Sequence, residues 1–139
     1  MLLRKFVTAA ALAGAMAVPA FAIASPSEAP PCILSEHNII SVIPYKVDEH
    51  IGKNVVQRVY GAQVYYQAEP GLTPEWLQLN FERHLAAMKG PTAMTDCALD
   101  LDKVRVDVTS AGSGYWVRLA APNATTGEEL LHRVQLLVK

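Results

Sequence analysis

The chain has 139 residues, two cysteines and a formal net charge of −1 at pH 7. Much of its 51% hydrophobic content lies in an alanine-rich N-terminal stretch. The whole chain has 12 basic and 13 acidic residues, and without the two basic residues of that stretch the formal charge is −3. This balance excludes nucleic acid and anionic lipid as electrostatic partners, and the remaining length of about 115 residues fits one domain.

The N-terminus has the order of features that is typical of a secretory signal peptide. Two basic residues precede an uninterrupted apolar stretch over residues 6–18, which is shorter than the roughly 20 residues of a membrane-spanning helix. Small residues at alternate positions follow, and they predict cleavage after Ala22 or Ala24. We therefore expect a signal peptide over 1–24, a periplasmic or secreted protein, and no membrane span after cleavage. The alternative is an anchor that is never cut.

The two cysteines, Cys32 and Cys97, both lie in the part of the chain that is predicted to be exported. In an oxidising compartment such a pair indicates a disulfide, whereas a redox motif or thiolate metal site usually places its cysteines close together in sequence. Closing a loop of about 65 residues stabilises a fold by roughly 4 kcal/mol in the chain-entropy model. We expect this bond to tie the N-terminal segment to the body of the domain.

Two β-prone stretches open the predicted domain, which we place at 38–139 after a flexible leader over 25–37. The first is the β-branched run from Ile39 to Ile43, which Pro44 must end or confine to a sheet edge. The second begins at Val55, and residues 62–68 within it alternate between two sets of side chains. Gly61, inside this second strand, indicates a bulge or bend.

A helix is predicted after the second strand. Thr73 supplies an N-cap, Pro74 occupies the first helical position, and the Gly-Pro pair at 90–91 stops the helix. A spacing of about 100° per residue gathers one apolar face with a histidine on it. That face consists of Leu77, Phe81, His84, Leu85 and Met88.

The C-terminal half predicts a β-hairpin followed by a second helix. Residues 103–109 alternate strictly, the glycine-rich stretch 111–114 makes a turn, and residues 115–120 alternate again. Thr126 with Glu129, or Thr125 with Glu128 in an equally acceptable register, forms a capping box for an amphipathic helix. The apolar face of this helix consists of Leu130, Leu131, Val134, Leu137 and Val138.

These elements predict the α+β class, with a small, mostly antiparallel sheet and two helices packed on one face. The order is strand, helix, strand, strand, helix, with an optional strand before it. This order resembles the ferredoxin-like split βαβ arrangement over roughly residues 55–139, with the closing strand missing or supplied from the N-terminal side. The resemblance concerns architecture alone, so it implies no function.

His84 is the histidine that attracts most interest, because it lies on the apolar face of the first helix with Met88 one turn away. A soft site of histidine and methionine ligands suits copper, and the disulfide could bring His37 and Met94 close enough to complete it. The alternative is a histidine at the edge of the core, bonded to backbone or to Asn80, with Met88 filling space.

The sheet face opposite the helices is the second candidate site. If the valines of the 103–109 strand face the helices, polar and aromatic side chains gather on the other face. Aromatic, arginine and amide groups are typical of a surface that recognises a protein or a sugar. The candidate residues are Tyr65, Arg105, Trp116 and Arg118. In the alternative, Trp116 packs beneath the N-terminal segment held by Cys32.

No catalytic motif appears in the chain, so we assign no catalytic residue and expect no cofactor. We favour a small exported module that binds a protein or a small molecule outside the cytoplasm, and not nucleic acid. The first alternative is a periplasmic copper-binding accessory protein that uses His84 and Met88. The second is a small enzyme whose site has no sequence signature.

Overall fold

The α+β class is confirmed by the computed structural model, which describes residues 31–90 and 96–138. The predicted signal peptide lies outside these residues. Four strands form one antiparallel sheet in the order β1-β2-β4-β3. One helix connects β2 to β3, and the second helix follows β4. The elements are η1 (Ile33–Ser35), β1 (Ile39–Ile51), β2 (Asn54–Gln67), α1 (Pro74–Met88), β3 (Arg105–Ala111), β4 (Gly114–Ala120) and α2 (Ala124–Gln135).

One face of the sheet carries the core. Val64 of β2 lies opposite Val117 of β4, which in turn lies opposite Val108 of β3, so the three side chains form a row across the sheet. The helices cover this row: α1 buries Leu77 and Phe81, and α2 buries Leu130 and Val134. Both helices therefore pack on the same face, as the sequence predicts.

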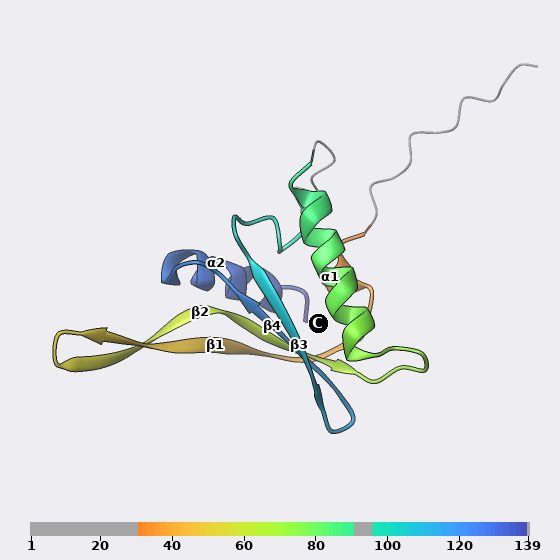
Figure 1. Cartoon of the computed structure of the whole chain (residues 1–139), viewed down its shortest axis with the longest axis horizontal. Coiled ribbons are helices and arrows are strands. Elements are labelled where there is room, and N and C mark those ends of the chain that lie inside the picture. Colours follow the sequence, from red (N-terminus) through yellow and green to blue (C-terminus); the bar gives the residue numbers. More distant parts are fainter. Residues whose placement is uncertain (1–30, 91–95, 139) are drawn as a thin grey trace, which may run out of the picture.

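The N-terminal strand, β1, forms one edge of the sheet beside β2. It does not end at Pro44 but continues to Ile51, because a strand at an edge has one side that needs no hydrogen-bond donor. β4 pairs with β2 only over residues 61–67. The remaining parts of β1 and β2 form a two-stranded ribbon that extends well beyond the rest of the sheet (Figure 1).

The base of this ribbon is shaped by two glycines. The β1–β2 register shifts between Tyr45 and Lys46, opposite Tyr60 and Gly61, so the bulge expected at Gly61 is confirmed. The φ angle of Gly61 is 154°, and a Cβ there would overlap the carbonyl oxygen of Leu119. Gly127 lets α2 approach the ribbon, because a Cβ on it would lie 2.5 Å from the Tyr60 backbone.

Two predicted boundaries are wrong, and each has a local cause. β3 begins at Arg105 and not at Lys103, because Lys103 has a φ of 56°, which an extended strand does not allow. α2 begins at Ala124, because Asn123 is the N-cap and its Oδ1 accepts a hydrogen bond from the Thr126 N–H at 2.8 Å. The first helix begins as predicted, with Thr73 accepting from the Trp76 N–H.

A glutamine from α1 closes the free edge of β3. The Gln78 Nε2 donates to the Val106 carbonyl at 2.9 Å, and its Oε1 accepts from the Val108 N–H at 2.8 Å. The amide thus makes the two hydrogen bonds that a neighbouring strand would make.

No helix within the described residues is long and apolar enough to cross a membrane.

Replacing Gly127 by alanine tests the packing of α2 on the ribbon. An alanine in a helix normally stabilises by about 1 kcal/mol over glycine, but here the new methyl group meets backbone atoms of Tyr60 and Val59. We expect Gly127→Ala to lower the free energy of unfolding by about 1–3 kcal/mol in urea titrations. Glu128→Ala, one residue further along and exposed, should stay within about 0.5 kcal/mol of wild type. A more stable Gly127→Ala protein would contradict the close approach.

Candidate binding face of the sheet

The face of the sheet opposite the helices carries two neighbouring aromatic rings, whose planes are tilted by 48° to one another. Tyr65 of β2 lies directly opposite Trp116 of β4, and their ring centroids are 4.9 Å apart. The Tyr65 hydroxyl donates to the Ala111 carbonyl at 2.9 Å, which fixes the ring over the β3–β4 turn. Both side chains are half-buried, so they form a rigid apolar platform that water still reaches.

Arg118 lies on the same face, two residues along β4 from Trp116. Its guanidinium carbon lies 5.2 Å from the centroid of the Tyr45 ring, and its Nη2 lies 3.5 Å from Asp107 Oδ2 on β3. That ion pair is longer than the 2.7–2.9 Å of a charge-assisted hydrogen bond. Among the described residues, no atom accepts a hydrogen bond from the Arg118 Nε, which is buried. The arginine is therefore held in place by its neighbours while its donors are incompletely used.

A hollow of about 320 Å³ opens beside Arg118. Arg105 on β3 joins its lining, and no carboxylate in the described part of the chain lies within ion-pair distance of Arg105. Two arginines against the single Asp107 give the hollow a net positive charge in a chain that is acidic overall. The arrangement can accept an anionic group next to an apolar ring.

The described part of the N-terminal segment, from residue 31 on, does not cover this face. Ile33 and Leu34 are buried in the core on the helix side, where the Tyr66 hydroxyl donates to the Leu34 carbonyl at 3.1 Å. The alternative in which Trp116 packs beneath the segment held by Cys32 is therefore wrong for the described residues. Ile33 and Leu34 belong to the stretch 25–37 that we predicted to be a flexible leader, yet both pack in the core.

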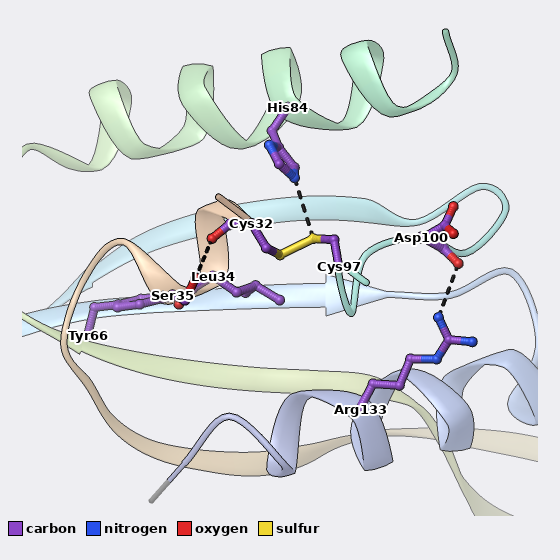
Figure 2. Close-up of a disulfide and its surroundings, with 8 residues drawn as sticks. All are labelled: Cys32, Leu34, Ser35, Tyr66, His84, Cys97, Asp100 and Arg133. Carbon is purple, nitrogen blue, oxygen red and sulfur yellow. Dashed lines mark hydrogen bonds between the residues drawn. A yellow bond between two sulfur atoms is a disulfide. The ribbon is translucent and has the colours of Figure 1, made fainter. Parts of the chain in front are cut away.

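The predicted disulfide between Cys32 and Cys97 is present, with the two Cα atoms 5.2 Å apart. It ties η1 and the loop before β3 together beneath α1, and Figure 2 shows His84 pointing from that helix toward the bond. His84 Nε2 lies 3.4 Å from Cys97 Sγ. A disulfide of this kind persists in a non-reducing environment.

The histidine and methionine candidates are only partly brought together. Met88 follows His84 on α1 but lines a separate hollow of about 280 Å³ with Leu85 and Leu99. His37 is elsewhere, with its Nδ1 3.2 Å from Glu69 Oε2, and Met94 lies outside the described residues. His84 contacts Cys97 and not Asn80, whose Nδ2 donates to the Trp76 carbonyl.

Two contacts of these sites escaped sequence reasoning. Tyr45 was missed because the sequence left open whether the strand ends at Pro44 or continues as an edge strand, and the strand continues to Ile51. The His84–Cys97 contact joins residues that approach only because the loop before β3 folds back under α1. No local pattern in the sequence signals that approach.

Comparison with protein-family models, with curated proteins and with solved structures gave no match for this chain. The function is therefore argued from the arrangement of its own residues.

His84 makes the stability of the fold depend on pH. Burial lowers the pKa of His84, and this effect outweighs the opposite influence of Glu36. Because the folded state then binds the proton less readily than the unfolded state, stability is lost as pH falls through the ordinary histidine range near about 6.5. We expect the melting temperature to fall less steeply between pH 8 and pH 5 in His84→Gln than in wild type.

The matched control is His132→Gln, which changes an exposed histidine in α2. It should keep the wild-type slope. Equal slopes for wild type and His84→Gln would show that burial does not affect the protonation of His84.

Proposed function

We propose that this chain is an exported, non-catalytic binding module, and that the open sheet face recognises an acidic ligand. The observation that carries the proposal is Arg118, which lies between Tyr45 and Asp107 and lines a hollow together with Arg105. An arginine held by aromatic and ionic contacts is preorganised. Binding of a ligand carboxylate therefore costs little free energy for ordering the arginine side chain.

The neighbouring side chains define the rest of the ligand. The Tyr65–Trp116 platform offers an apolar surface next to the arginines, and Arg105 adds a second cation. A carboxylate attached to a sugar ring or to a peptide has both features, because each carries an acid beside a surface that can stack on an aromatic ring. The proposal that the protein is exported rests on the basic, apolar and small-residue order of the N-terminus and agrees with the disulfide.

Titration calorimetry with two acidic probes tests this function. One is an oligomer of galacturonic acid and the other is a peptide rich in aspartate and glutamate, each compared with its neutral counterpart. We expect one acidic probe to bind with an affinity that falls as salt rises. Arg118→Gln should weaken that binding about 10- to 100-fold, since a hydrogen bond to a charged group contributes about 1.5–3 kcal/mol.

The control for charge is Arg83→Gln, because Arg83 is exposed on α1 and far from this face in the fold. It should leave the affinity unchanged. The proposal fails if neither acidic probe binds more tightly than its neutral counterpart, or if both arginine variants weaken binding equally.

A copper-binding role for His84 and Met88 is the second candidate, favoured by the donors around the disulfide. The ligand atoms of Cys32, His84 and Cys97 all lie within 4.8 Å of one another. While the disulfide is intact, the sulfurs carry no thiolate, and His84 supplies the one strong ligand of the three. Burial also lowers the pKa of His84 and so favours the neutral imidazole, the form that binds metals.

Measuring the melting temperature with and without Cu(I), Cu(II) and Zn(II) tests the second candidate. A metal that binds the native state must raise this temperature, and His84→Leu should abolish the rise while the metal-free fold remains. His132→Leu serves as the control and should keep it. An equal rise in wild type and His84→Leu would place any metal elsewhere in the chain.

A further inference from the structure

The two edge strands of the sheet, β1 and β3, differ in whether their outer backbone groups are hydrogen-bonded by another element. At the β3 edge, the Gln78 amide already occupies the Val106 carbonyl and the Val108 N–H. At the β1 edge no described element adds a further strand. β1 is also the longer of the two edge strands, with 13 residues against seven. A long unpaired edge is a surface on which another strand can pair.

The side chains of β1 alternate in a way that a partner strand would have to match. Lys46, Asp48 and His50 are exposed on one face of the ribbon. The other face carries Ile43, Tyr45, Val47, Glu49 and Ile51, of which Ile43 is 42% and Ile51 is 50% exposed. A suitable partner strand therefore places an acidic group opposite Lys46 and a basic group opposite Asp48. On the other face it places apolar groups opposite Ile43 and Ile51.

A second copy of β1 meets both demands when it runs antiparallel with Val47 opposite Val47. In that register Lys46 faces Asp48 of the second copy, and the same pair occurs twice by symmetry. On the other face, Ile43 lies opposite Ile51 of the second copy. Opposite charges and apolar pairs across neighbouring strands stabilise a sheet.

The neighbouring symmetric registers are unfavourable. Centring the pair on Lys46 places two lysines directly opposite each other, and centring it on Asp48 does the same with two aspartates. Like charges in that position are destabilising. Pro44 is compatible with the Val47 register, because it faces His50 of the second copy, and its carbonyl can accept a hydrogen bond although its nitrogen cannot donate one.

We propose that two copies of this chain associate through β1, antiparallel and centred on Val47, to form one continuous sheet. The association buries Ile43 and Ile51, and it places the open faces of the two copies side by side. It does not depend on the ligand proposed for that face, so each can fail without the other.

Charge reversal on the disulfide-bonded protein tests both the association and its register. Light scattering after size exclusion should find wild type as a dimer, and Lys46→Asp and Asp48→Lys should each give monomers because each places like charges opposite one another. Combining the two changes restores opposite charges at both pairs, so the Lys46→Asp, Asp48→Lys double variant should return to a dimer. Lys89→Asp at the end of α1 is the control and should remain dimeric.

Circular dichroism shows whether each variant is folded, and the double variant guards against a single change that merely unfolds the ribbon. Wild type that stays monomeric at about 1 mM overturns the proposal, since even a weak association would be populated there. A dimer that tolerates both single reversals, or a double variant that remains monomeric while folded, overturns the proposed register and with it the β1 interface.

Discussion

The structure depends on the burial of one face of its sheet. The row of Val64, Val117 and Val108 crosses three strands at one level, and both helices and the N-terminal segment pack on that side. Because a strand turns successive side chains to opposite faces, the same row determines that Tyr65, Trp116 and their neighbours point away from the core. The candidate binding face is thus a consequence of the register that builds the core.

The Cys32–Cys97 bond decides where the chain before β1 lies. It holds η1 beneath α1, where Leu34 fills the core and its carbonyl accepts the hydrogen bond of the buried Tyr66 hydroxyl. Figure 2 shows the second link across this region, in which Arg133 of α2 donates to the Asp100 carbonyl at 3.3 Å. Burial raises the pKa of Tyr66, so this hydroxyl stays neutral and remains a donor. With η1 fixed on the helix side, no described residue before β1 covers the opposite face.

Sequence patterns predicted what local periodicity controls and missed what tertiary contacts decide. The class, both helices, the β3–β4 hairpin and the disulfide were predictable from alternation, capping residues and the pair of cysteines. The strand beyond Pro44 was not, because whether proline ends a strand depends on whether the strand lies at an edge. For the site, alternation suggested Tyr65, Arg105, Trp116 and Arg118 for one face, and the strand registers place them there. Tyr45 beneath Arg118 requires the β1–β2 register.

The central claim is that the open face is free for a ligand, and fluorescence quenching of Trp116 tests it most directly. Trp76→Phe removes the other tryptophan, which is 45% exposed on α1, and leaves Trp116 as the single tryptophan, which can be excited apart from the tyrosines. In the disulfide-bonded protein, neutral acrylamide should quench Trp116 to a degree intermediate between a buried and a free indole, and negatively charged iodide should quench it comparatively well because Arg105 and Arg118 lie near. A Trp116 that neither quencher reaches would show that the face is covered, and it would contradict the account.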